Sequence, residues 1–245
     1  MDTLLVRERY KVVQVLEARE DYAFAEAVDI LDREHRSCLL NIYEGPLLRI
    51  YVDCFDRMKG CPAFLDVFAE GGSLVTVFET CEGKPIDHVF FRGDRHDWRT
   101  RMDYAGKLLH AALNMADLPV EVSCAAMLSE NVRIDENDQE VHLRFRVSPM
   151  VGMNPRELVY LTGDQLGKIL LPRFGSPVEQ LELLDDFRDR LSRGSLTSVV
   201  QLYSLWQDRR GQIEEAYEKL EKMNFVRRWI ALAWGRVKRR MTRSR

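Results

Sequence analysis

The chain has 245 residues, of which 46% are hydrophobic and 31% charged, and its formal net charge is −3. This composition is that of an ordinary globular protein with a sizeable apolar core, and it excludes a low-complexity chain. The five cysteines are odd in number and scattered without a CxxC pair, which argues against a disulfide framework and a zinc site. No secretory signal is evident and no segment approaches the roughly 18 to 20 apolar residues of a membrane span, so we expect a cytoplasmic location.

The first 80 residues predict an antiparallel sheet with one helix. Short segments rich in β-branched and aromatic residues alternate with polar stretches, as strands do. The helix is expected at residues 47–58, where apolar side chains recur at helical spacing. A Gly71-Gly72 turn marks the clearest hairpin. The expected strands are residues 9–16, 22–30, 37–44, 63–70 and 73–80.

The remainder of the chain predicts helices around one further hairpin. Residues 97–115 carry apolar side chains on one helical face. The hairpin follows, with strands at 131–134 and 141–145 and a polar turn between them. Gly211 predicts a break in the third of the later helices. These later helices are expected at residues 156–171, 177–192, 195–221 and 222–241.

Residues 122–147, VSCAAMLSENVRIDENDQEVHLRFRV, resemble the catalytic segment of protein kinases. In that family an acid–base Asp and a metal-binding Asn lie in H-R-D-L-x-x-x-N, and a second metal-binding Asp lies in D-F-G after the next hairpin. Asn131 aligns with the Asn. The His, Arg and Asp positions are then held by Cys124, Ala125 and Ala126, and the D-F-G positions by Arg144, Phe145 and Arg146.

Other positions of the family pattern also differ in this chain. Residues 16–24, where kinases have a glycine-rich phosphate loop, contain no glycine and three carboxylates. The strand Lys that contacts the phosphates is replaced by Asn41, and the helix at 47–58 has no Glu to pair with a Lys. The segment after D-F-G is short and has no A-P-E motif. The chain therefore resembles a pseudokinase.

The resemblance implies an α+β, bilobal protein-kinase-like fold. Its N-lobe, residues 1–80, would have a five-stranded antiparallel sheet with one helix, and its C-lobe, residues 81–221, would be reduced and mostly helical. Residues 222–245 would form a separate basic tail. We expect no catalytic activity, no cofactor, no metal and no nucleotide binding. The degenerate site positions are Asn41, Ala126, Asn131, Arg144, Phe145 and Arg146.

An enzyme remains the alternative interpretation. It would be an atypical nucleotide-binding protein with residual phosphotransfer activity, using Asn131 together with an acidic residue that the sequence does not identify. A single Asn without a carboxylate partner is a poor magnesium ligand set. Each of the missing kinase groups would cost orders of magnitude in rate if catalysis depended on it, which favours the inactive interpretation.

The charge of the chain is unevenly distributed. Residues 222–245 contain nine Lys or Arg and no Asp or Glu, so the other 221 residues sum to −12. The tail also has a broad apolar face, as an interfacial membrane helix requires. The residues expected to bind a membrane or partner are Phe225, Arg227, Arg228, Trp229, Trp234, Arg236, Lys238, Arg239 and Arg240.

Two interpretations of the tail stay open at this stage. It could lie on the inner face of the cytoplasmic membrane or on a membrane-protein partner, so that the protein is a peripheral scaffold or regulatory module. It could equally be a last helix packed on the C-lobe with a solvated basic fringe. The acidic remainder of the chain argues against nucleic acid as a partner, because it would repel phosphates. The sequence does not identify a protein partner.

Overall fold

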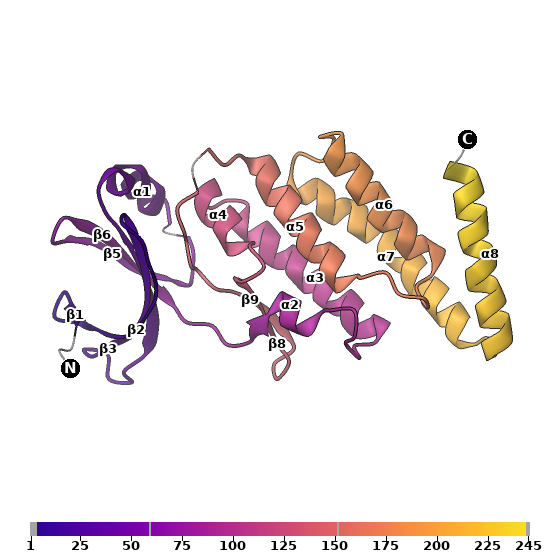
Figure 1. Ribbon diagram of the computed structural model, residues 1–245, viewed down its shortest axis with the longest axis horizontal. Helices are drawn as coiled ribbons and strands as arrows, with labels where there is room; N and C mark the ends of the chain where they lie inside the picture. The colour runs from indigo at the N-terminus through magenta and orange to yellow at the C-terminus, as the bar shows by residue number, and fades with distance from the viewer. Residues whose placement is uncertain (1–3, 59, 151, 244–245) are drawn as a thin grey trace. The chain divides into compact units, whose positions relative to one another are not determined.

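The structure is a computed structural model that describes residues 4–58, 60–150 and 152–243, without the side chains of residues 238, 240, 242 and 243 (Figure 1). The chain forms two compact units. The first unit contains residues 1–85 and 114–154, and the second contains residues 86–113 and 155–245. Each unit thus combines two separate stretches of sequence, whereas the predicted domains divide the chain at residues 80 and 221.

The first unit is built on one antiparallel sheet with the strand order β1-β2-β3-β4-β6-β5. The sheet has six strands, so the predicted five are one too few. The additional strand, β1, has only two residues and therefore shows no alternating pattern in the sequence. The strands are β1 (Leu5–Val6), β2 (Tyr10–Ala18), β3 (Tyr22–Asp29), β4 (Ser37–Tyr43), β5 (Phe64–Glu70) and β6 (Ser73–Glu79).

The pairing register assigns the side chains of this sheet to two faces. One face carries an apolar cluster that includes Tyr10, Leu40 and Val77. The other face packs against α1 (Pro46–Asp56), whose buried side chains include Tyr51 and Phe55. Tyr51 stacks on Tyr43 with ring centroids 4.4 Å apart. We call this second face the α1 face; it carries Glu17, Tyr22, Phe24, Glu26, Leu39, Asn41, Tyr43, Thr76 and Phe78.

The rest of the first unit is a short helix and a small second sheet. The helix is α4 (Val120–Ala126), and the sheet has the order β7-β8-β9. Its strands are β7 (Lys84–Pro85), β8 (Val132–Asp135) and β9 (Glu140–Leu143). Cys124–Ala126, which align with the His, Arg and Asp positions of the kinase motif, lie within α4. Their small side chains are fully buried.

The second unit is helical. Its elements are α2 (Ile86–Val89), α3 (Trp98–Met115), α5 (Pro155–Ile169), α6 (Val178–Ser192), α7 (Val199–Glu221) and α8 (Phe225–Arg243), with the last two residues of α3 belonging to the first unit (Figure 1). The predicted break near Gly211 is wrong, because α7 continues through it. The α7 helix begins instead at Ser198, whose side chain accepts a hydrogen bond from the Gln201 amide.

Buried polar groups join the helices of the second unit. Asp94, which is almost fully buried, accepts hydrogen bonds from Arg101 and Arg173. Burial alone would raise the pKa of Asp94, but the hydrogen bonds and charges of these two guanidinium groups outweigh it and lower that pKa. Gln180 donates to the Leu170 carbonyl at 2.9 Å. These hydrogen bonds therefore fix α3, α5 and α6 to one another.

Candidate functional site

Asn41 lies at the centre of the first unit and has an exposed fraction of 0%. Its Nδ2 donates to the Phe145 carbonyl at 3.0 Å. Its Oδ1 accepts hydrogen bonds from the Val147 amide at 2.8 Å and the Tyr22 hydroxyl at 2.9 Å. The side chain that replaces the kinase Lys therefore binds the backbone of the segment just after β9.

Asn131 binds the same segment from the other side. Its Nδ2 donates to the Arg146 carbonyl at 3.0 Å and to the Ala125 carbonyl at 2.7 Å. Its own carbonyl accepts from the Arg144 amide at 2.8 Å. Asn131 Oδ1 is buried and has no hydrogen-bond partner among the residues that the structure describes. The predicted positions 41, 131 and 144–146 thus converge. We call Asn41, Asn131 and residues 144–147 the Asn41 cluster.

The two cations of the Asn41 cluster form ion pairs with the sheet. Arg144 contacts Glu26 at 2.7 Å, and Arg146 Nε contacts Glu17 at 2.8 Å. Both carboxylates lie on the α1 face, in β2 and β3. In kinases the corresponding two strands flank the phosphate loop. These pairs are partly buried, and Glu17 also pairs with Arg19, so both carboxylates have cationic partners within the protein.

Aromatic residues complete the cluster. The Phe145 ring stacks on Phe78 with a centroid distance of 4.8 Å and an interplanar angle of 4°. The Tyr43 hydroxyl donates to the Val147 carbonyl at 2.7 Å. The Tyr51 hydroxyl accepts from the Met150 amide at 2.9 Å, and burial raises the pKa of Tyr51 to about 12. The space next to the α1 face is therefore occupied by protein atoms at this point.

Ala126 has a different position from the other predicted residues of this site. It is fully buried at the end of α4, and the α4 residue that contacts Asn131 is its neighbour Ala125, through a backbone carbonyl. A methyl group can neither accept a proton nor bind a metal. The polar groups of the cluster are two amides, two guanidinium groups and two carboxylates already paired to them. This set can hold a backbone segment in place, and both of its carboxylates form ion pairs within the protein.

The β8–β9 hairpin brings together three possible metal ligands that sequence reasoning missed. Ligand atoms of Asp135, Asp138 and His142 lie within 4.8 Å of one another. The antiparallel register creates this group, and residue spacing alone does not indicate it. Asp135 accepts from the Asn137 amide, and Asp138 accepts from the Glu140 amide and contacts His142 at 2.8 Å. Stabilisation of the turn is sufficient to explain the group.

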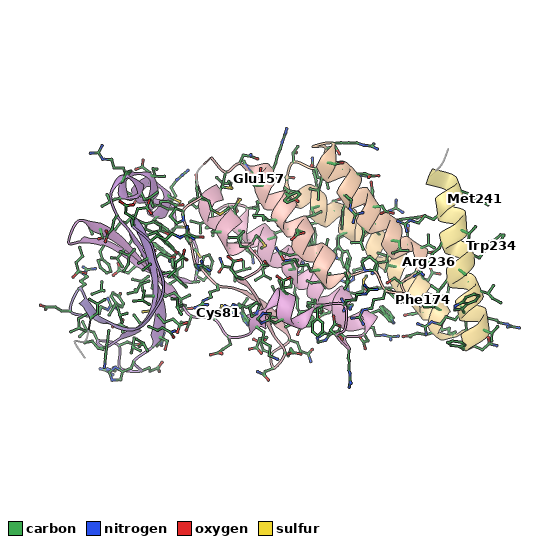
Figure 2. All side chains as sticks on the ribbon, viewed as in Figure 1. Cys81, Glu157, Phe174, Trp234, Arg236 and Met241 are labelled. Atoms are coloured by element: carbon green, nitrogen blue, oxygen red, sulfur yellow. The ribbon has the colours of Figure 1, made fainter. Side chains whose placement is uncertain are left out.

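In the second unit, α8 exposes most of its large apolar side chains. Phe225 is 82% exposed and Trp234 is 71% exposed. Trp234 and Met241 lie on the side of α8 turned away from the other helices of this unit (Figure 2). We call the following residues the outer face of α8: Val226, Ile230, Trp234, Val237 and Met241, all of them exposed.

The opposite side of α8 packs on α6. Leu232 is only 5% exposed. Arg239 pairs with Asp185, and Arg236 donates to the Phe174 carbonyl at 2.7 Å. We call Leu232, Gly235, Arg236 and Arg239 the docked face of α8. Of the remaining residues predicted to bind a membrane or partner, Arg227 and Trp229 are exposed, Arg228 is half-buried, and the side chains of Lys238 and Arg240 lie outside the described residues.

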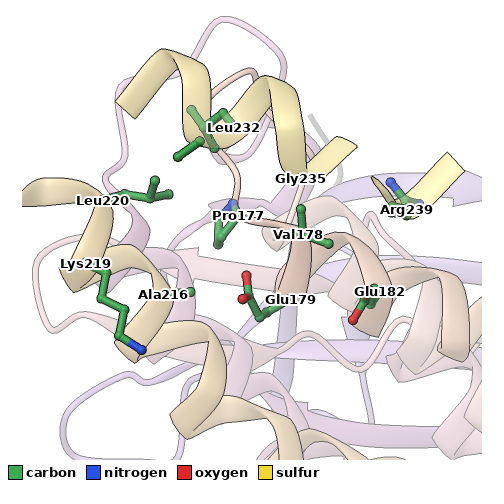
Figure 3. A pocket seen from close by; sticks show the side chains of 11 residues that line it. Pro177, Val178, Glu179, Glu182, Ala216, Lys219, Leu220, Leu232, Gly235 and Arg239 are labelled. Carbon is green, nitrogen blue, oxygen red and sulfur yellow. The ribbon is translucent and has the colours of Figure 1, made fainter. Parts of the chain in front are cut away.

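A hollow of about 410 Å³ lies between α6, α7 and α8. Figure 3 shows Leu232 and Gly235 of α8 facing Pro177 and Val178 at the start of α6. A Cβ atom on Gly235 would lie 2.5 Å from Val178 Cγ2, so only glycine permits this approach. The α8 helix therefore contacts α6 closely at Gly235 and leaves a gap beside it. Among the described helices, none is both long enough and apolar enough to span a bilayer.

Comparison with known proteins reveals similarity at the level of fold. A solved structure described as an apo pseudokinase matches with a TM-score of 0.54 and 11% sequence identity, over 82% of this chain and 92% of that chain. No family model matches, and no curated protein matches. The chain therefore has a fold like that of protein kinases, with antiparallel sheets and eight helices in the described residues.

Proposed function

We propose that this chain is a catalytically inactive kinase-like domain that works by binding, as a scaffold or regulatory module at an anionic membrane surface. The proposal has two parts, which concern different units of the molecule. The first is that the Asn41 cluster does not bind nucleotide. The second is that α8 carries the protein to the membrane.

The hydrogen bonds of Asn41 support the first part most strongly. A kinase needs an ammonium group at this position to contact phosphate, and here an amide already has three partners within the protein. Arg144 and Arg146 are paired with Glu26 and Glu17, so a phosphate group would have to displace those carboxylates. A magnesium ion would meet guanidinium groups in place of a carboxylate. Both changes oppose binding of ATP with magnesium.

Thermal unfolding in the presence of nucleotide tests this part. A ligand that binds the native state raises the melting temperature, and at 100 times its Kd it stabilises by about 2.7 kcal/mol. We expect no change in melting temperature at millimolar MgATP, and no transfer of labelled phosphate to the protein itself or to a generic substrate. A rise in melting temperature that saturates with MgATP concentration would show that the protein binds nucleotide. It would contradict the first part of the proposal and favour the alternative, an atypical nucleotide-binding enzyme.

The outer face of α8 supports the second part. Its five apolar side chains form a continuous stripe, and the helix and its flanking residues carry cations without a single acid. Trp beside Arg is typical of helices that lie in the interface of a bilayer. Each cation near an anionic leaflet contributes on the order of 1 kcal/mol. Two copies of this chain packed through α8 would bring like charges together, which makes an anionic bilayer the better fit.

Sedimentation with lipid vesicles tests the second part. Ile230→Asp and Trp234→Asp each place a carboxylate on the outer face, and we expect each to reduce binding to vesicles that contain phosphatidylserine by about tenfold or more. Val200→Asp is the matched control, because Val200 is an equally exposed apolar residue at the start of α7. Equal pelleting of all three variants with the unaltered protein would refute the membrane proposal.

A further inference from the structure

The docked and outer faces of α8 lie on opposite sides of one helix. Successive residues of an α-helix are rotated by about 100°, so residues 232, 235, 236 and 239 share one side. Residues 226, 230, 234, 237 and 241 share the other side by the same geometry. Figure 2 shows this division, with Arg236 on the inner side and Trp234 and Met241 on the outer side. Contact with α6 therefore leaves the whole outer face accessible.

The contacts of the docked face are specific. Arg236 donates to the Arg173 carbonyl at 2.9 Å and to the Phe174 carbonyl at 2.7 Å, and its guanidinium lies 5.1 Å from the centroid of the Phe174 ring. Arg239 pairs with Asp185 of α6. The docked cations thus already have partners within the second unit, and a lipid phosphate would gain little by displacing them.

Packing at Gly235 holds α8 in one position along α6. The Gly235 backbone sits directly on Val178, where any side chain would clash. Val178 is β-branched and has little freedom to move aside. Leu232 fills the neighbouring position and is nearly fully buried. Together these contacts define both the distance and the register between α8 and α6.

We propose that α8 binds an anionic bilayer while it remains docked on α6. This inference rests on the proposed function, because it presumes that α8 is the membrane-binding element. The α8 helix then acts as a rigid membrane-binding element, which fixes the orientation of the second unit on the bilayer surface. A flexible tether would instead have to release Arg236, Leu232 and Arg239 before binding.

A disulfide between α6 and α8 tests the inference directly. A Cβ atom on Gly235 would lie 3.8 Å from Val178 Cβ, which is the separation of a native disulfide. The full-length Val178→Cys/Gly235→Cys variant should therefore form this bond upon oxidation. Cys81, which is only partly buried, is replaced by Ser in all samples, and the Cys81→Ser protein serves as the oxidation control. A mass shift after digestion verifies the crosslink.

We expect the oxidised and reduced forms to bind phosphatidylserine vesicles with affinities that agree within about twofold, and neither to bind phosphatidylcholine vesicles. A loss of about tenfold or more in the oxidised form alone would overturn the inference, because it would mean that α8 must leave α6. Absence of binding by the unaltered protein would refute the proposed function itself. The two failures are therefore distinguishable.

Hydrogen exchange of the unaltered protein provides a second measurement that needs no variant. If α8 stays docked, amides in residues 178–185 keep their protection when phosphatidylserine vesicles are added. Release of α8 would expose Val178 and Asp185, and exchange in this segment would then accelerate. Faster exchange in residues 178–185 upon vesicle binding would contradict the proposal that α8 stays docked on α6.

Discussion

The Asn41 cluster and α8 distribute polar and apolar side chains in opposite ways. In the cluster, amides and guanidinium groups lie inside the first unit with partners at hydrogen-bond distance. In α8, large apolar side chains lie on the surface, and a leucine, a glycine and two arginines face the protein.

The two regions differ in how much free energy their side chains can gain from contact with a ligand. A buried polar group that has its partners gains little from a ligand, since the ligand must first displace those partners. Exposed apolar area gains free energy from any surface that removes it from water. Most polar groups of the Asn41 cluster thus have partners within the protein, whereas α8 exposes apolar side chains to solvent.

The largest expected effect concerns Asn41. Asn41→Leu keeps the branched shape and the number of non-hydrogen atoms of the side chain but leaves the Val147 amide, the Phe145 carbonyl and the Tyr22 hydroxyl without this partner. We expect a loss of about 3 to 5 kcal/mol in the free energy of unfolding, measured with urea. Gln14→Ala, an exposed substitution in the same sheet, should change it by less than about 0.5 kcal/mol. Similar values for both variants would show that the cluster does not hold the first unit together.

Alkaline pH should weaken the first unit through Tyr51. Burial raises the pKa of Tyr51 to about 12, above the ordinary value of about 10. Because the folded pKa is the higher one, its contribution is complete below about pH 10 and is lost as pH rises toward 12. Tyr51→Phe should therefore reduce the loss of unfolding free energy between about pH 9 and 11 by about 1 kcal/mol.

The control for this titration is Tyr160→Phe, because Tyr160 is exposed on α5 in the second unit. If Tyr51→Phe and Tyr160→Phe gave the same pH profile, Tyr51 would not be buried against the segment after β9.

The smallest effect compares two glycines within helices. A Cβ atom at Gly211 would meet nothing within 4 Å, so Gly211→Ala should stabilise the protein by about 0.5 to 1 kcal/mol through helix propensity. Gly235→Ala should show no such gain, because its Cβ would clash with Val178. Hydrogen exchange should also show weaker protection of α8 in Gly235→Ala. Equal stabilisation by both substitutions would mean that α8 does not pack closely on α6.

Sequence patterns predicted most helices and strands of this fold, but not which residues contact one another. Alternation and turn residues located β2 to β6 to within about two residues. The same rules failed for β1, which is too short to alternate, and for Gly211, where packing of the flanking turns overrides a weak local preference.

The candidate sites show the same limit. The structure brings Asn41, Asn131 and Arg144 to one segment, although Asn41 is far from the other two in the sequence. The resemblance did not predict that Arg146 pairs with Glu17, which is 129 residues away. Likewise the sequence predicted a tail helix with a broad apolar face, yet Leu232 of that helix is buried whereas Ile230 and Trp234 are exposed. Periodicity defines a stripe, and tertiary packing decides which side is covered.

The amide of Val147 gives the most direct test of the central claim, because it donates to Asn41 Oδ1 at 2.8 Å within the first unit. Its nitrogen–proton resonance can be followed by NMR during titration with MgATP. If Asn41 keeps its three partners within the protein, the resonance stays unchanged up to millimolar nucleotide. A shift that saturates with MgATP concentration would show that nucleotide enters the cluster, and would contradict the account.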